Sequence, residues 1–339
     1  MNNLEYQEIK EEVMLCDVKG NLNPQAAGWS RFPLQVCNLS GHFLRKKKWN
    51  YWCITSDRYM FSVTLSDVDY VGLAFVYYMN FETKEFQEDT LMIPLGTGMR
   101  LGERVHHTAE YAGKNVSIRF KQSGNQIHLS TNWKNFHGRA LTSEITVTIP
   151  EQHETLNVVV PWSNSRFQYT SKQHSLPANG FFQLDEKKYP FNPENSFACL
   201  DFGRGIWPYS ISWNWGAFTA KSGQNIVGFN MGDKWTDGTG ITENSICLNG
   251  KLHKIQEALK LEYDHTNFMK PWKIGSTLTD TVQLTFTPFY ERVAKSNLLI
   301  LQSEVHQCYG RYDGFIKVSN ERFEIKGAIG WAEEHIAKW

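Results

Sequence analysis

Apolar and polar residues alternate along most of this chain, and a period of two is the signature of strands with one face buried. Residues 116–120 and 127–130 show the alternation on either side of a Ser-Gly-Asn turn at 123–125, which predicts a hairpin. The pattern returns at residues 145–149 and 282–286. Short strands separated by Gly and Asn turns predict an all-β chain that folds into sandwiches or barrels.

Helical periodicity, by contrast, is scarce. Residues 151–157 and 332–338 are the two places where a short helix is expected.

The chain is expected to contain two similar halves, because its 339 residues exceed one ordinary domain. The Trp-Asn-Tyr-Trp sequence of residues 49–52 is echoed by the Trp-Asn-Trp of residues 213–215. A polar stretch at residues 161–166 lies between these halves and is typical of a boundary. The predicted domains are therefore residues 1–165 and residues 166–339, each a β-barrel or sandwich.

Composition and charge argue against several classes of protein. The 35 Lys and Arg residues balance 35 Asp and Glu, so no net positive field gathers nucleic acid. No apolar run approaches the roughly 18 residues of a membrane-spanning helix. Residues 1–13 lack the apolar stretch of a secretory signal, which predicts a cytoplasmic protein. The six cysteines form no C-x-x-C pair and are expected to be buried small hydrophobic residues.

Local motifs predict neither a cofactor nor a metal ion. The phosphate-binding patterns GxGxxG and GxxxxGK[ST], the zinc motif HExxH and the serine-hydrolase motif GxSxG do not occur in the sequence. His106 and His107 are adjacent, so on a strand they point to opposite faces and are not expected to bind one metal ion together.

Tryptophans gather beside Gly, Arg, Asp and Asn in a few short segments, in a chain that is 14% aromatic. Aromatic walls carrying a few polar groups are typical of pockets for apolar ligands. The candidate ligand-binding residues are Trp29, Arg31, Trp49, Trp52, Trp207, Trp213 and Trp215. The alternative is that these tryptophans fill the core, as large aromatic residues do in any β protein.

Four acidic residues also lie in Gly-, Asn- or Trp-rich surroundings: Asp201, Asp237, Glu243 and Glu333. Burial against Trp raises the pKa of a carboxyl group, which can then donate a proton near neutral pH. Beside Arg204, however, an acid such as Asp201 would stay ionised, and that pair could simply close the end of a barrel. Both interpretations remain open at this point.

An ordered series of motifs runs through the chain: Gly-Trp-Ser-Arg (28–31), Lys-Trp-Asn-Tyr-Trp (48–52), Leu-Pro-Ala-Asn-Gly (176–180), Asp-Phe-Gly-Arg-Gly-Ile-Trp-Pro (201–208), Trp-Asn-Trp (213–215), Thr-Glu-Asn (242–244), Phe-Thr-Pro (286–288), Tyr-Gly-Arg-Tyr-Asp-Gly (309–314) and Ala-Glu-Glu-His-Ile-Ala-Lys-Trp (332–339). From about Gly28 to the last residue, this series resembles the domain of unknown function 2804 family.

By a more distant likeness, that family is similar to tandem lipocalin-type proteins, among them carotenoid hydratases, kievitone hydratase and tocopherol cyclase. The likeness implies two lipocalin-like (calycin) β-barrels in tandem, with an apolar pocket lined by aromatic residues. It also implies a reaction in which an isoprenoid double bond is protonated and the cation is captured by water or an internal hydroxyl. A neutral carboxylic acid and aromatic faces suit such a reaction.

The first hypothesis is therefore an acid-catalysed hydratase, cyclase or isomerase that acts on an apolar, terpenoid or lipid-like molecule without a cofactor. The candidate proton donors are Asp201, Glu243 and Glu333, with Arg204 and His335 positioning the donor.

The main alternative is a carrier of a hydrophobic small molecule, since such barrels bind ligands without chemistry. A carbohydrate-active protein is a third and weaker interpretation. The oligomeric state stays open.

Overall fold

The computed structural model describes residues 6–298 and 301–338. In these ranges it consists of strands, loops and one short 3-10 turn, η1 (Pro24–Ala26), with no α-helix. The all-β prediction is confirmed, and the two expected helices are wrong. Residues 332–338 belong to strand β25 (Glu321–Lys338), and residues 151–157 form a turn that leads into strand β13 (Leu156–Ser163). Strand β25 is paired on both sides, so backbone pairing decides its conformation.

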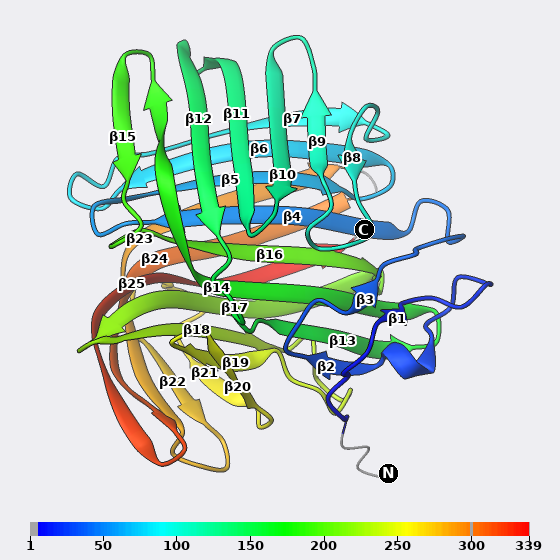
Figure 1. Cartoon of the computed structure of the whole chain (residues 1–339), viewed down its shortest axis with the longest axis vertical. Helices are drawn as coiled ribbons and strands as arrows, with labels where there is room; N and C mark the ends of the chain where they lie inside the picture. Colours follow the sequence, from blue (N-terminus) through cyan, green and yellow to red (C-terminus); the bar gives the residue numbers. More distant parts are fainter. Residues whose placement is uncertain (1–5, 299–300, 339) are drawn as a thin grey trace.

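The first sheet curls around an aromatic core, and Figure 1 shows strands β10–β12 crossing in front of β4–β6. Within the core, Phe182 stacks on Tyr189 with 4.4 Å between ring centroids. The sheet contains β2 (Gly28–Ser30), β4 (Lys46–Thr55), β5 (Tyr59–Asp67), β6 (Val71–Asn80), β7 (Phe86–Pro94), β8 (Arg100–Leu101), β9 (Ala109–Ala112), β10 (Val116–Ser123), β11 (Gln126–Phe136), β12 (Arg139–Thr148), β13, β14 (Arg166–Leu184), β15 (Lys187–Phe191) and β16 (Phe197–Ile206).

The second sheet follows in the chain and curls around its own core of apolar side chains, including Phe229, Trp272 and Phe286. Its long strands bend at Gly314, whose φ of +132° and whose approach to the Gln283 carbonyl leave no room for a side chain. The sheet contains β17 (Ser210–Ser222), β18 (Asn225–Asp233), β19 (Asn244–Leu248), β20 (Lys251–Ile255), β21 (Leu259–Glu262), β22 (Trp272–Ser276), β23 (Val282–Leu298), β24 (Leu301–Val318) and β25.

The chain passes from one sheet to the other between Ile206 and Ser210. Residues 166–206, which the sequence division assigns to the second half, therefore form hydrogen bonds within the first sheet. The polar stretch at residues 161–166 lies at the tight turn between β13 and β14, where Ser163 pairs with Arg166.

A parallel pair of short strands, β1 (Val13–Met14) and β3 (Gln35–Val36), lies in the N-terminal segment. All six cysteines are buried and free, as predicted. Among the described residues, no helix has the length and apolarity needed to cross a bilayer.

The two sheets pack back to back, and this contact contains its own apolar clusters. One cluster joins Tyr51, Cys53 and Tyr77 of the first sheet to Trp215 and Tyr309 of the second. Strand pairing places one row of side chains from each sheet at this contact. In the first sheet, Lys172, Asp201 and Tyr51 are neighbours on adjacent strands. Trp215, Glu333 and Gln307 are neighbours across the second. The sheet interface thus brings polar residues together inside the molecule.

Candidate functional site

Lys172 on β14 lies in the interface between the sheets with 5% of its surface exposed. Its Nζ is 2.8 Å from Asp201 Oδ2 and 3.1 Å from Glu243 Oε1, and it lies 4.2 Å from the centre of the Trp215 ring. Burial alone would lower the pKa of Lys172, but the facing carboxylates Asp201 and Glu243 outweigh it and raise that pKa above its usual value. Lys172 is therefore a fixed buried cation.

Glu333 on β25 is the third carboxyl group at this interface and is 6% exposed. Its Oε1 accepts a hydrogen bond from Trp213 Nε1 at 3.1 Å, and its Oε2 accepts one from Gln307 Nε2 at 2.8 Å. Burial raises the pKa of Glu333 to about 7, against the partial opposition of the Trp213 bond and the charge of Lys172. Near neutral pH a large share of Glu333 is therefore protonated.

The charges of this cluster do not balance if every acid is ionised. One ammonium group, Lys172, faces the carboxyl groups of Asp201, Glu243 and Glu333. Burial also raises the pKa of Glu243, with a further rise from the charge of Asp201, while the charge of Lys172 opposes both. An uncompensated buried charge raises the free energy of the folded protein. The state of lower free energy is therefore one in which one of these acids carries a proton. We refer to Lys172, Asp201, Glu243 and Glu333 as the ion cluster.

A chain of tyrosines and an amide leads away from Glu333. Tyr51 and Tyr77 share a hydrogen bond of 2.7 Å between their hydroxyl oxygens. The Oε1 atom of Gln307 accepts hydrogen bonds from Tyr77 at 3.4 Å and from Tyr309. These bonds fix the orientation of the Gln307 amide, so its NH2 group faces Glu333.

Beyond the tyrosines, Arg292 and Glu88 form a two-point ion pair, with bonds of 2.7 and 2.5 Å. The charge of Arg292 also acts on Glu333 and lowers its pKa slightly.

A pocket of about 330 Å³ opens between the sheets beside the ion cluster. Its buried wall includes His174, Cys199 and Trp331. Each of these lies two residues from a member of the ion cluster on the same strand: Lys172, Asp201 and Glu333, respectively. Same-face neighbours on a strand are about 6.5–7 Å apart, so the ion cluster lies near the pocket, although none of its members is among the lining residues. A second hollow of about 510 Å³ shares Ser56, Asp57 and Asn195 with the first.

Four of the predicted tryptophans, Trp49, Trp207, Trp213 and Trp215, lie at the interface, although none of them is among the residues that line the pocket. Trp207 lies at the centre of a cluster in which Trp213 is 5.5 Å away and Trp235 5.8 Å away between ring centroids. Trp49 and Trp162 complete this tryptophan cluster. Trp215 lies beside it on β17, next to Lys172 and 5.2 Å from Trp331.

His335 also faces the interface, where its ring is tilted against that of Trp213 with 4.0 Å between ring centroids. Its Nε2 lies 2.7 Å from the Ser303 hydroxyl. Burial lowers the pKa of His335 to about 3, so the ring is neutral at ordinary pH.

Arg204 and Trp52 face the other way, into the core of the first sheet. Arg204 donates to the carbonyls of Gly102 and Trp49 and to Asn50 Oδ1. Asp201 instead pairs with Lys172, because residues three apart on a strand point to opposite faces. Arg204 therefore stabilises the first sheet and lies away from the ion cluster.

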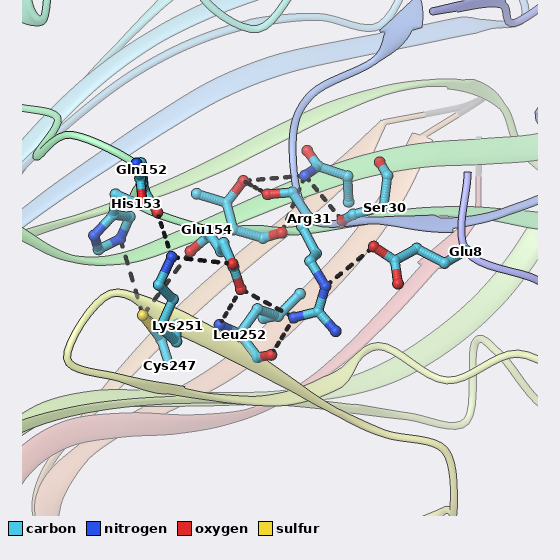
Figure 2. Close-up of polar contacts among 11 residues, drawn as sticks. Glu8, Ser30, Arg31, Gln152, His153, Glu154, Cys247, Lys251 and Leu252 are labelled. Carbon is cyan, nitrogen blue, oxygen red and sulfur yellow. Dashed lines mark hydrogen bonds and ion pairs between the residues drawn. The ribbon is translucent and has the colours of Figure 1, made fainter. Parts of the chain in front are cut away.

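Trp29 and Arg31 lie in the N-terminal segment and do not line the pocket. Figure 2 shows Arg31 between two acids, with its Nε 3.0 Å from Glu8 and its Nη1 2.9 Å from Glu154. Arg31 also donates to the carbonyl of Leu252 on β20. These contacts fasten the N-terminal segment to both sheets.

Sequence reasoning missed Lys172, His174, Tyr77, Gln307 and Tyr309. A signal for the first two was present in residues 168–175, a polar run with a single charged residue. Such a run is too polar for an ordinary buried strand and too weakly charged for an exposed one. Tyr77 lies in the apolar run of residues 74–79, and Tyr309 begins the motif of residues 309–314, but neither surrounding points to a role in the site.

Solved structures share this fold at low sequence identity. The crystal structure of CghA with Sch210972 is 11% identical, with a TM-score of 0.53 over 87% of this chain and 89% of that one. Kievitone hydratase from Nectria haematococca is 12% identical, with a TM-score of 0.52 over 88% of this chain and 90% of that one. No curated protein matches the sequence. The family model described as Domain of unknown function (DUF2804) matches residues 6–339, and the chain belongs to that family, as its motifs predict.

Proposed function

We propose that this protein is an enzyme that protonates a carbon–carbon double bond of an apolar small molecule and directs the capture of the resulting cation. Glu333 is the proton donor. The observation that carries the proposal is the burial of this carboxyl group, which raises its pKa to about 7 beside aromatic walls. An acid with such a pKa keeps its proton at neutral pH and still gives it up readily.

The surroundings of Glu333 suit the proton transfer. When the carboxyl proton moves to one carbon of the double bond, the π electrons form the new C–H bond and the other carbon becomes a cation. The carboxylate left behind keeps its bonds from Trp213 and Gln307 and gains from the nearby charges of Lys172 and Arg292. Aromatic side chains that line the pocket, among them Phe197, Phe218 and Trp331, can stabilise the cation.

The second step completes the reaction and restores the enzyme. Water or a hydroxyl group of the same molecule adds to the cation, and the proton released from that oxygen returns to the Glu333 carboxylate. Asp201 and Glu243 keep their contacts with Lys172 in this scheme. A fold shared with a protein named as a hydratase supports the same class of reaction.

The test compares Glu333→Gln with the control Glu324→Gln, which changes an exposed residue of the same strand. Both are incubated with terpenoid and unsaturated lipid extracts in deuterium oxide, because protonation of the double bond then leaves deuterium on carbon whichever oxygen captures the cation, and products are read by mass spectrometry. We expect label incorporation by wild type and by the control, and a loss of at least about 100-fold for Glu333→Gln, the range of a lost general acid. Full turnover by Glu333→Gln would overturn the assignment.

One observation favours a second function, that of a carrier. The pocket lining contains His174, Cys199 and Trp331, whereas no carboxyl group of the ion cluster is among the lining residues. A binding protein needs no acid within reach of its ligand. Retention of an apolar ligand without any turnover, unchanged in Glu333→Gln, would favour the carrier over the enzyme.

We place the protein in the cytoplasm, with an apolar small molecule as its partner. Six buried free cysteines suit a reducing compartment. A net charge of zero gives no reason to expect nucleic acid as a ligand.

A further inference from the structure

The side chain of Glu333 accepts two hydrogen bonds from the described residues and donates none to them. Trp213 Nε1 donates to Oε1 at 3.1 Å, and Gln307 Nε2 donates to Oε2 at 2.8 Å. An indole N–H can only donate, whereas the amide of a glutamine has a donor end and an acceptor end. The orientation of the Gln307 amide therefore decides which group faces Oε2 of Glu333.

Turning this amide over would reverse its effect on the acid. With the NH2 group toward Oε2, Gln307 stabilises the carboxylate of Glu333, because it donates a hydrogen bond to a charged acceptor. With the amide oxygen toward Oε2, it would accept the acid proton and stabilise the protonated form. The first orientation leaves the acid proton without an acceptor among the described residues, and so available to a substrate.

Tyrosine hydroxyl groups favour the first orientation. The Oε1 atom of Gln307 accepts from Tyr309, and from Tyr77 at 3.4 Å. The Tyr51 hydroxyl lies 2.7 Å from that of Tyr77 and donates to it, so each of the three hydroxyl hydrogens has an oxygen acceptor. In the reverse orientation the hydroxyl groups would point the other way, and Tyr51 would have no oxygen acceptor among the described residues.

Burial makes this network rigid. Tyr77 and Tyr309 are each 1% exposed, and Gln307 is 3% exposed. A buried hydroxyl group that loses its partner leaves an unsatisfied donor, which raises the free energy of the folded protein. The hydroxyl groups therefore resist rotation of the amide.

Charged groups on three other strands also act on Glu333. Lys172 on β14 and Arg292 on β23 lower the pKa of Glu333, and Asp201 on β16 raises it. Glu243 contacts the same Lys172. None of these charges changes when the amide turns over, so the effect of the amide adds to theirs.

The other titratable side chains around Glu333 are neutral. Burial lowers the pKa of His335, two residues along β25, to about 3. Burial raises the pKa of Tyr77 and of Tyr309 above the usual value of a tyrosine. Near neutral pH these residues act on Glu333 through hydrogen bonds and packing, without a charge of their own.

We propose that Gln307 is a positioning residue for the acid: Tyr77 and Tyr309 hold its amide with the NH2 group toward Glu333, so that the acid proton stays free for the substrate. This inference deepens the proposed function, on which it rests, by naming what keeps the donor ready to react. Its main test follows the ionisation of Glu333 without any substrate. Failure of the inference can therefore be distinguished from failure of the proposed reaction.

The first experiment follows the Glu333 carboxyl group by carbon-13 NMR in the full-length protein with Gln307→Met. Methionine has a similar length and no N–H group, so the carboxylate loses a charge-assisted hydrogen bond. We expect the ionisation midpoint of Glu333 to rise by about 1 pH unit, the size expected for one hydrogen bond to a charged group. An unchanged or lower midpoint would overturn the proposal.

The second experiment separates orientation from direct contact. Tyr309→Phe removes a hydroxyl group that bonds to Gln307 and not to Glu333. It should raise the midpoint by at least about 0.5 unit in the wild-type background and leave it unchanged in the Gln307→Met background, because the two changes act through one amide. A rise that persists without the amide would contradict the proposal.

The matched control is Tyr312→Phe, at a buried tyrosine of the same strand whose hydroxyl donates to the Trp331 carbonyl at 2.6 Å. It should leave the midpoint of Glu333 unchanged. An equal rise for Tyr312→Phe and Tyr309→Phe would mean that loss of any buried hydroxyl has this effect, which would overturn the role of Gln307.

The pH dependence of deuterium incorporation tests whether Gln307 acts in the reaction. The rate falls at high pH as the donor loses its proton, and in Gln307→Met this fall should move upward by about the same 1 pH unit. The rate at lower pH should decrease, because an acid of higher pKa gives up its proton less readily. A fall at the wild-type pH in Gln307→Met would remove Gln307 from the reaction.

Discussion

Trp213 donates its indole N–H to Glu333 across 3.1 Å, although the two residues are 120 positions apart in the chain. The contact follows from the pairing of β17 with β25, in which Trp215 lies opposite Glu333 and Trp213 opposite His335. It places a tryptophan and a protonated acid on the same face of the second sheet. The predictions below follow from this arrangement and from the ion cluster beside it.

The stability of the protein should depend on the ionisation of Glu333. Its pKa rises from 4.5 to about 7 on folding, so between these pH values the folded state binds more protons than the unfolded state. The stabilising contribution is therefore full below pH 4.5 and lost as pH rises through 7, an effect of about 3 kcal/mol. Urea denaturation from pH 4.5 to 7.5 should show a flatter profile for Glu333→Gln than for wild type. Parallel profiles would contradict the prediction.

The pKa of His335 should make the stability of the protein change with pH in the direction opposite to the effect of Glu333. The pKa of His335 falls from 6.5 to about 3 on folding, so below pH 6.5 the unfolded state binds the additional proton. Its contribution is full above pH 6.5 and declines by about 2 kcal/mol at pH 5. His335→Gln should lose less stability than wild type between pH 6.5 and 5, measured by denaturation. His128→Gln, at an exposed position, is the control and should follow wild type.

Removal of the central cation should be more harmful than removal of the whole ion cluster. Lys172→Met leaves Asp201 and Glu243 facing each other in a buried site, at a cost of about 3–5 kcal/mol. The triple variant Lys172→Met, Asp201→Asn, Glu243→Gln removes the unpaired charges and should recover most of that loss. Denaturation midpoints measure both. A single variant as stable as wild type would mean that these charges are already exposed to water.

The packing around Glu243 should not tolerate a methyl group at Gly232. A Cβ atom there would lie 2.1 Å from Glu243 Oε2 and 3.0 Å from Trp235 Nε1. Gly232→Ala should displace Glu243 from Lys172 and destabilise the protein by about 1–3 kcal/mol. Gly275→Ala is a matched control in a strand, since its nearest neighbour is 3.7 Å away. Equal midpoints for the two variants in thermal denaturation would contradict the described packing.

The sequence predicts that the chain forms β-sheets, but it does not predict where each sheet begins and ends in the chain. Alternation identifies the all-β fold. The contact between the echoed segments, with Tyr51 and Trp215 in ring contact at 5.8 Å, is not predicted by the sequence. The helix expected at residues 332–338 fails because β17 and β24 pair with it on both sides. The polar turn at residues 161–166 has the composition of a linker between domains. Only the long-range pairing of the strands on either side shows that it is a turn within one sheet.

The candidate site could be predicted in part, because some of its residues have a distinctive local sequence and others are brought in only by strand pairing. Trp- and Gly-rich surroundings pointed to Asp201, Glu243 and Glu333, which the fold brings together around Lys172. Their shared cation could not be predicted, because Lys172 is joined to them only through strand register and sheet packing. Arg204 lies near Asp201 in the sequence and yet faces the other side of the sheet.

The central claim is that Glu333 keeps its proton near neutral pH, and the most direct measurement is a carbon-13 NMR titration of glutamate carboxyl groups. The difference between wild type and Glu333→Gln identifies the resonance. The structure predicts an ionisation midpoint of about 7 for that carboxyl group. A midpoint near the ordinary 4.5 would contradict both the buried neutral acid and the proposed proton transfer.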